Sequence, residues 1–133
     1  MPTQNQEDYL RALYILDEKG MELKSSEVAS YLKVSKPSVS EMVRRLNEEG
    51  LVKAEPYSKL KFTKKGKKLA EQLTGKHRII ELFLIKILKR SDEHIHEEAH
   101  RLEHAFSDES IERMKGLLGN PKTDPHGKPI PNG

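Results

Sequence analysis

The chain has 133 residues, of which 35% are hydrophobic and 34% charged, and its formal net charge is +3. This length suits one domain, or two small ones that share a core, and no stretch approaches the roughly 18 apolar residues of a membrane span. The start of the chain lacks a signal-peptide pattern and there is no cysteine, so we expect a cytoplasmic protein that binds any metal through nitrogen and oxygen.

Helical signals dominate the first part of the chain. Apolar residues at helical spacing predict a helix from about Gln6 to Lys19, with Gly20 as its stop. Ser25 or Ser26 is expected to cap a short second helix.

A third helix is predicted directly after a tight turn. Ser35 is expected to cap it, with Pro37 in its first turn, where a missing N–H costs nothing, and Gly50 is expected to end it. Two short helices joined in this way are typical of a helix-turn-helix, although any helical hairpin has the same spacing.

The segment LVKAEPYSKLKFT, residues 51–63, alternates in polarity on both sides of EPYSK, which predicts a two-stranded hairpin. Seven lysines and a single acid lie between Lys53 and Lys68. A run of charge is usually a solvated face. Beside a helix-turn-helix, however, it predicts the basic wing of a winged helix, placed to contact DNA phosphates.

A long helix capped by Thr63 is predicted over about Lys64–Lys89. Its second half, IIELFLIKIL, is apolar nearly all round, so we expect it to be buried on more than one side. Because a domain this small has little core of its own, we expect the second apolar face of this helix to be buried in a homodimer interface. A homodimer would also fit DNA binding, since two-fold symmetric proteins bind two half-sites.

The string SDE at 91–93 and again at 107–109 is expected to start two further helices, the second ending near Leu118. The tail GNPKTDPHGKPIPNG is rich in Pro and Gly and predicts an extended arm that is not a packed element. The predicted fold is therefore mainly α. It comprises a winged helix-turn-helix domain over 1–72, with a small β-hairpin wing and the start of the long helix, a helical dimerisation domain over 73–119, and a C-terminal arm over 120–133. The histidines of the second domain, described next, make it a metal-binding domain as well.

Four of the six histidines lie in HIHEEAHRLEH, residues 94–104. On one continuous helix, three of these histidines are four residues apart and a glutamate lies on the same stripe: His96, His100, Glu103 and His104. His100, Glu103 and His104 can then converge on one ion, and this mixture of imidazole and carboxylate suits zinc, iron, nickel or manganese. The alternative is a polar helix face that is merely rich in histidine.

His77 and Glu81 are also four apart, on the apolar helix. A buried polar pair must be satisfied, either by a plain His–Glu hydrogen bond or by a second ion shared with His96. The string HRLEH, residues 100–104, also matches the signature of inverted zinc peptidases, in which Glu103 would be the general base. Since the residues that follow offer little to build a substrate cleft, no enzymatic activity is expected.

The order of these segments resembles the diphtheria-toxin-repressor family of metal-dependent transcriptional regulators, which has iron-dependent and manganese-transport-regulator branches. The resemblance covers nearly the full length and rests on EDYLRALYIL, SKPSVSEMVRRLNEEGLV, FTKKGKKLA, KHRIIELFL and HEEAHRLEHAFSDE. It implies a homodimeric repressor that binds a palindromic DNA operator when loaded with metal and controls metal-homeostasis genes. A metal-independent winged-helix regulator with structural histidines is the alternative.

The resemblance also implies functional residues. The regulatory metal site would consist of Asp8, His100, Glu103 and His104, and the ancillary site of His77, Glu81 and His96. The DNA contacts would be Ser35, Pro37, Ser38, Ser40 and Glu41, with Lys36 and Lys59 as added phosphate contacts. Pro37 and Ser38 offer apolar contact to thymine methyl groups.

This chain departs from both branches. Asp8 and His100 stand where iron-type members commonly have methionine and cysteine, while manganese-type members have a glutamate at the His100 position. Arg11 stands where the manganese branch uses a further glutamate. The expected metal is Fe²⁺ first and Mn²⁺ next, with Zn²⁺, Co²⁺ or Ni²⁺ binding in vitro. The chain also stops at the arm, where iron-type members continue into a small SH3-like domain. Neither a membrane nor a small-molecule substrate is an expected partner.

Overall fold

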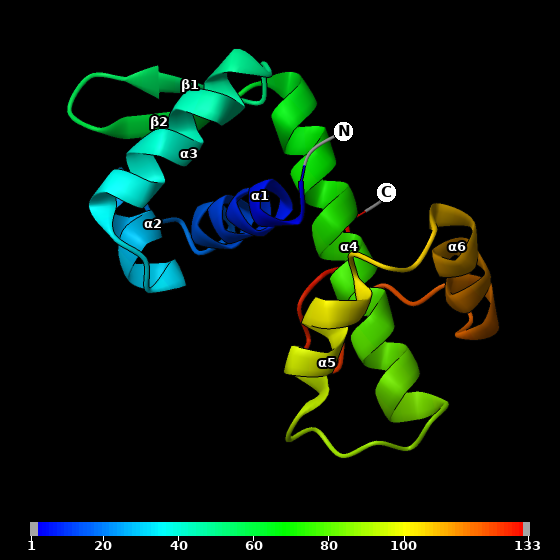
Figure 1. Ribbon diagram of the computed structural model, residues 1–133. Coiled ribbons are helices and arrows are strands. Elements are labelled where there is room, and N and C mark those ends of the chain that lie inside the picture. Colours follow the sequence, from blue (N-terminus) through cyan, green and yellow to red (C-terminus); the bar gives the residue numbers. More distant parts are fainter. Residues whose placement is uncertain (1–2, 132–133) are drawn as a thin grey trace. The chain divides into compact units, whose positions relative to one another are not determined.

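The computed structural model describes residues 3–131, and the chain divides into two compact units, Met1–Glu71 and Gln72–Gly133. In chain order the elements are α1 (Gln4–Glu18), α2 (Ser25–Leu32), α3 (Lys36–Glu48), β1 (Val52–Glu55), β2 (Lys59–Phe62), α4 (Lys64–Lys86), α5 (Ile95–Leu102) and α6 (Asp108–Leu117) (Figure 1). This mainly helical fold with one antiparallel hairpin confirms the predicted fold class. None of the helices in the described part of the chain is long and apolar enough to cross a membrane.

The helix-turn-helix consists of α2 and α3. Ser35 is the N-cap of α3, as predicted, and its Oγ accepts a hydrogen bond from the Ser38 N–H at 3.2 Å. The prediction of a serine cap for α2 was wrong, because Ser25 is already helical and Lys24 occupies the N-cap without a side-chain hydrogen bond. Lys33 then takes the left-handed conformation, with φ 57°, that ends α2 and turns the chain.

The core of the first unit joins these helices to the hairpin. α1 contacts α2 and α3, and α3 contacts β1. The buried apolar residues of the helices follow the helical spacing of the sequence and include Leu10, Leu13, Leu16, Val28, Val39 and Leu46, and Val52 of β1 is buried with them. α4 begins where Gly66 passes over a backbone carbonyl, since a Cβ at Gly66 would lie 1.8 Å from the Leu51 oxygen. Thr63 caps this helix, as predicted, by accepting a hydrogen bond from Gly66 at 3.0 Å.

The wing is fixed to the rest of the first unit. In the hairpin Val52 pairs with Phe62 and Glu55 with Lys59. The Leu60 N–H donates to the Leu23 carbonyl at 2.7 Å, which ties β2 to the segment between α1 and α2. These contacts fix the position of the wing relative to the helices of the first unit, α3 included.

The second unit packs the C-terminal part of α4 together with α5 and α6. Its buried core consists of Ile79, Ile80, Leu84, Ile95, Ala99, Ile111 and Met114. The first SDE string does not start a helix: residues 91–94 are exposed, and α5 begins at Ile95, where burial begins. The second SDE string behaves as predicted, since Ser107 Oγ accepts a hydrogen bond from the Ser110 N–H at 3.1 Å.

The C-terminal arm is extended but packed, so the prediction that it is not a packed element was wrong. Ile130 packs against the core, and Asp124 is 7% exposed. Arg78 of α4 donates from Nη1 to the Pro129 carbonyl at 2.5 Å, and its Nε lies 3.8 Å from Asp124 Oδ2. A buried ion pair thus holds the arm against α4. The arm has no hydrophobic periodicity, so its packing could not be predicted from the sequence.

Candidate metal centre and nucleic-acid interface

A cluster of two imidazoles and a carboxylate lies where α4 meets α5, and its third member, His96, is exposed on its outer side. His77 and Glu81 are each 3% exposed, and His77 Nε2 lies 3.6 Å from Glu81 Oε1. His96 of α5 places its Nδ1 3.1 Å from His77 Nε2 and 3.6 Å from Glu81 Oε2. One ligand atom from each of the three residues lies within 4.8 Å of the others. The structure therefore brings together the three residues predicted for the ancillary site.

The charge of Glu81 depends on its two imidazole neighbours. Burial by itself raises the pKa of the Glu81 carboxyl, but the hydrogen bonds and charge of His77 and His96 lower that pKa to about 2. Glu81 is therefore ionised at neutral pH. A buried charge is stable only when it is paired, and the two imidazoles are the partners that the Glu81 carboxylate has in this cluster.

A second group of contacts begins on the other ring nitrogen of His77. His77 Nδ1 lies 3.2 Å from Oε1 of Glu103, a residue that is only 1% exposed. The same oxygen lies 3.2 Å from His100 Nδ1. Glu103 therefore lies between two imidazoles, and polar contacts run without a break from His100 through His77 to His96.

The helix that carries these residues is shorter than the predicted stripe requires. α5 ends at Leu102, so Glu103 is its C-cap and His104 lies in the turn that follows. The rings of His100 and His104 still meet edge to face, with centroids 5.5 Å apart. The single stripe was therefore wrong: His96 joins the cluster around His77, while His100 and His104 pair with each other.

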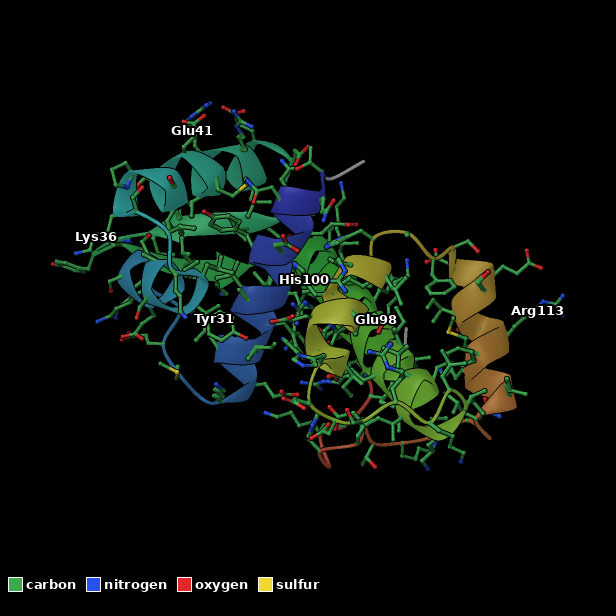
Figure 2. All side chains as sticks on the ribbon, turned by 60° about the horizontal axis from the view of Figure 1, so that its bottom comes forward. Tyr31, Lys36, Glu41, Glu98, His100 and Arg113 are labelled. Atoms are coloured by element: carbon green, nitrogen blue, oxygen red, sulfur yellow. The ribbon has the colours of Figure 1, made fainter. Side chains whose placement is uncertain are left out.

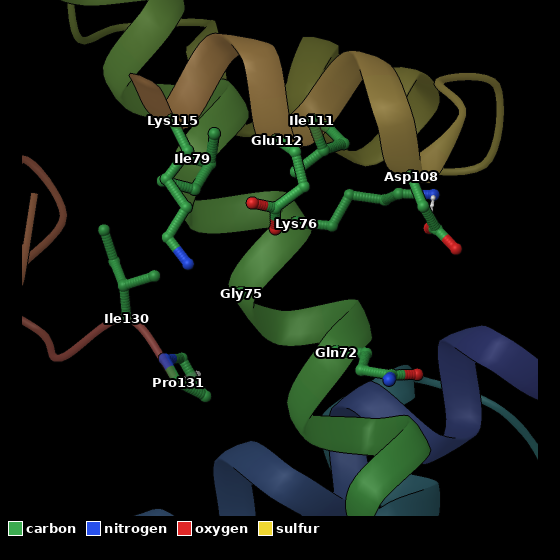
Figure 3. A pocket seen from close by; sticks show the side chains of 10 residues that line it. All are labelled: Gln72, Gly75, Lys76, Ile79, Asp108, Ile111, Glu112, Lys115, Ile130 and Pro131. Carbon is green, nitrogen blue, oxygen red and sulfur yellow. Dashed lines mark ion pairs between the residues drawn. The ribbon is translucent and has the colours of Figure 1, made fainter. Parts of the chain in front are cut away.

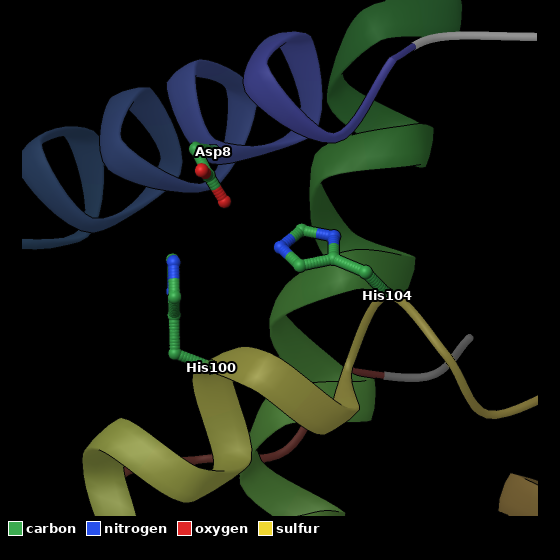
Figure 4. Close-up of side chains that lie close together, drawn as sticks. All are labelled: Asp8, His100 and His104. Atoms are coloured by element: carbon green, nitrogen blue, oxygen red, sulfur yellow. The ribbon is translucent and has the colours of Figure 1, made fainter.

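Asp8, the remaining residue predicted for the regulatory site, lies on α1 of the first unit, whereas His100 and His104 belong to the second unit (Figure 4). Asp8 is partly exposed, which leaves its carboxylate accessible to a ligand. Arg11, one turn further along α1, is 8% exposed. A buried arginine thus occupies the position at which the resemblance implies a metal-binding glutamate in the manganese branch.

Sequence reasoning missed a second donor set for Glu81. One ligand atom each from Glu81, Asp124 and His126 lies within 4.8 Å of the others. His126 Nε2 also lies 3.0 Å from Asp92 Oδ1, a contact that orients the ring. The string DPH in the tail was the available signal. This string did not predict a site, because the arm was expected to be unpacked.

A pocket of about 160 Å³ lies between α4, α6 and the arm (Figure 3). Ile79, Ile111 and Ile130 supply apolar surface, and Lys76 Nζ pairs with Asp108 Oδ1 at 3.6 Å. Since its lining contains neither an imidazole nor any predicted ligand, the pocket is not part of the metal clusters.

The residues predicted to contact DNA lie at the start of α3 and on β2. All six at α3 are exposed: Ser35, Lys36, Pro37, Ser38, Ser40 and Glu41. Figure 2 shows Lys36 and Glu41 extending outward from α3. Lys59 of β2 is half-buried and forms an ion pair with Glu22 at 2.7 Å.

Two arginines of α3 were missed by sequence reasoning. Arg44 Nη2 lies 2.6 Å from Glu41 Oε1, and Arg45 Nε lies 3.3 Å from the same oxygen. The hydrogen bond from Arg44 lowers the pKa of the Glu41 carboxyl. Exposed pairs of this kind add little to stability. Their consequence is that Glu41 holds two guanidinium groups on the exposed side of α3.

Two family models together match most of the chain. One describes the N-terminal DNA-binding domain of iron-dependent repressors, over residues 1–60, and the other their metal-binding and dimerisation domain, over residues 63–132. The iron-dependent repressor IdeR of Mycobacterium tuberculosis is 38% identical over 125 residues, which are 94% of this chain and 54% of IdeR. The chain thus spans about half the length of the curated relatives that it matches first.

A shorter relative and two solved structures extend this likeness. An uncharacterised HTH-type transcriptional regulator of Methanocaldococcus jannaschii is 37% identical over 114 residues, which are 85% of this chain and 91% of that protein. The manganese regulator SloR superposes with a TM-score of 0.85 at 44% identity, covering 98% of this chain and 61% of SloR. A manganese-dependent transcriptional repressor in complex with manganese has a TM-score of 0.88 at 34% identity, covering 96% of this chain and 58% of that one.

Proposed function

Because the chain belongs to the iron-dependent repressor family, we propose that it is a transcriptional repressor that binds a palindromic DNA operator as a homodimer when its metal sites are loaded. The genes it controls would be those of metal-ion homeostasis. The observation that carries the proposal is the unbroken set of imidazole and carboxylate contacts in the second unit, in which the buried His77 contacts both Glu103 and His96.

The donor atoms of these clusters fit a divalent ion. Each set combines imidazole nitrogen with carboxylate oxygen, a mixture that suits first-row divalent metals. A bound ion would place positive charge beside the buried Glu81 carboxylate. We propose Fe²⁺ first and Mn²⁺ next as the effector, with Zn²⁺, Co²⁺ and Ni²⁺ able to compete in vitro. The iron-dependent and manganese-dependent relatives support this range.

Control of DNA binding would come from Asp8. In the proposed regulatory site Asp8 belongs to the unit that carries α3, whereas His100, Glu103 and His104 belong to the other unit. Ligands drawn from both units would fix the separation of the two α3 helices in a dimer, which must match half-sites about 34 Å apart. Because an effector shifts an equilibrium only through unequal affinity for its two states, the Asp8 carboxylate is what makes metal loading favour the DNA-binding state.

The second unit also has surface suited to a homodimer. Ile87, Leu88 and Leu117 are 42%, 52% and 65% exposed, although large apolar side chains usually avoid water. The matched family model is itself that of a metal-binding and dimerisation domain. These observations support a dimer formed through the second unit.

The proposal is tested by stripping the protein with a chelator and titrating Fe²⁺, and separately Mn²⁺, by anaerobic calorimetry. The same samples are then tested for binding to duplexes selected from a random pool. We expect two ions per chain and DNA binding that the chelator abolishes. DNA binding that survives the chelator would instead support a metal-independent regulator with structural histidines.

A further inference from the structure

The pocket between α4, α6 and the arm lies within the second unit and has an apolar floor (Figure 3). Ile79 and Ile111 are 2% and 8% exposed, and Ile130 joins them from the arm. The volume of about 160 Å³ is well below the roughly 300–1,000 Å³ of pockets that hold drug-sized molecules. The pocket therefore suits a metabolite of about ten non-hydrogen atoms that has an apolar part.

Contacts between the three segments fix the walls of this pocket. Lys76 of α4 donates from Nζ to the Phe106 carbonyl at 2.8 Å and lies 3.6 Å from Asp108 Oδ1, which holds the start of α6 against α4. Gly75 lets the arm approach the same helix, since a Cβ at Gly75 would lie 3.1 Å from the Pro131 carbonyl oxygen. A ligand would thus enter a pre-formed site and pay little for ordering it.

Two side chains of opposite charge line the pocket from α6. Figure 3 shows Glu112 and Lys115 extending from α6 toward α4, and Lys115 is half-buried. Neither side chain forms an ion pair or a hydrogen bond with any residue of 3–131, whereas Lys76 is already paired with Asp108. On a flat surface such charges would only be solvated. Beside an apolar floor, they match a small ligand that carries one negative and one positive group.

We propose that this pocket binds a free α-amino acid with a branched aliphatic side chain, such as leucine. The aliphatic part would lie on the three isoleucines. The carboxylate would accept hydrogen bonds from the Lys115 ammonium group, and the α-ammonium group would donate to the Glu112 carboxylate. None of the described lining residues is a proposed metal ligand, so this binding does not depend on the proposed function.

The test is a calorimetric titration of the intact chain, stripped of metal so that the amino acid cannot act as a chelator. L-leucine is compared with isocaproate, which lacks the ammonium group, and with isoamylamine, which lacks the carboxylate. We expect one leucine per chain. Both analogues should bind at least about tenfold more weakly, because each leaves one charged side chain of the pocket without a partner.

Two substitutions separate the two ion pairs. Lys115→Met removes the ammonium group but keeps an unbranched side chain, so it should weaken leucine binding about tenfold and leave isoamylamine binding unchanged. Glu112→Gln should weaken leucine binding by about the same factor and leave isocaproate binding unchanged. Glu109→Gln is the matched control, because Glu109 is an exposed acid of α6 outside the pocket. Thermal unfolding of each variant establishes that it is folded.

Four results would overturn the proposal. The first is no binding of leucine up to about 10 mM. The second is isocaproate binding as tight as that of leucine, since the ammonium group would then not be recognised. The third is wild-type affinity for leucine in the folded Lys115→Met variant. The fourth is an equal loss in Glu109→Gln and Glu112→Gln, which would place the ligand elsewhere on α6. None of these results bears on metal or DNA binding.

Discussion

The Nδ1 nitrogen of His77 lies 3.2 Å from Oε1 of Glu103, while the Nε2 nitrogen of the same ring lies 3.1 Å from His96. One imidazole thus contacts members of both proposed metal sites. A histidine that binds metal through one nitrogen usually donates the other N–H to a carboxylate, which fixes the orientation of both groups. His77 is therefore positioned to hold Glu103 in place for the regulatory site.

We expect His77→Ala to weaken metal binding at both proposed sites and His96→Ala to weaken it at the ancillary site only. Loss of an orienting partner typically reduces metal affinity by about 10- to 100-fold. Calorimetric titration of Mn²⁺ into the stripped variants measures the two affinities separately. His96→Ala is the matched control, since it removes an imidazole of the same cluster that does not bridge to Glu103. Indistinguishable titrations of the two variants would show that His77 does not couple the sites.

We expect Asp8→Ala to abolish metal-dependent DNA binding while leaving the stability of the metal-free protein within about 0.5 kcal/mol of the wild type. The reason is that Asp8 is the only proposed regulatory ligand in the unit that carries α3. Fluorescence anisotropy with a selected duplex measures the binding, and urea unfolding measures the stability. Asp17→Ala is the control, because Asp17 is an exposed acid on the same helix. Normal operator binding by Asp8→Ala would disprove the account of Asp8.

We expect Lys36→Ala to weaken DNA binding evenly across sequences. Removing one phosphate contact should reduce the slope of log affinity against log salt by about 0.9. The measurement is a series of binding isotherms between low and moderate salt concentrations. Lys122→Ala removes an exposed lysine from the arm and should leave the slope unchanged. A slope that is equal in the two variants would place Lys36 away from the phosphates.

We expect Arg78→Ala to destabilise the metal-free protein by about 3–5 kcal/mol, because the buried Asp124 carboxylate loses its guanidinium partner and keeps only the hydrogen bonds from the backbone N–H groups of His126 and Lys128. Urea unfolding gives the free energy of unfolding. The control is Arg113→Ala, which breaks a pair with Glu109 on the surface, where the Arg113 side chain is 81% exposed. That loss should change stability by no more than about 0.5 kcal/mol. Equal effects of the two substitutions would mean that the arm is not held by Arg78.

The helix-turn-helix and the wing were predictable because their signals are local. Ser35 caps α3 through a residue three positions away, and Gly20 and Gly50 follow helices with φ of 76° and 74°. Apolar spacing placed the buried face of α3, since Val39 and Leu46 lie inside as their periodicity requires. Caps, turns and hydrophobic periodicity involve residues close together in the chain, so they can be predicted from the sequence.

From the sequence, the candidate metal ligands could be recognised only by their residue types. Their grouping depended on where α5 begins and ends, and a helix eight residues long places His96 against His77 and leaves His104 in a turn. No local pattern encodes that boundary, because burial of Ile95 decides where the helix starts.

The sequence by itself thus determined the helices, the wing and the chemistry of the donor atoms. The tertiary structure decided which donors meet: it placed His77 between Glu103 and His96, and it brought Asp124 and His126 of the arm to Glu81. The physical reason is that these contacts join residues far apart in the chain. Their distances are set by the packing of α4, α5 and the arm around a shared core, which no pattern within a few residues can specify.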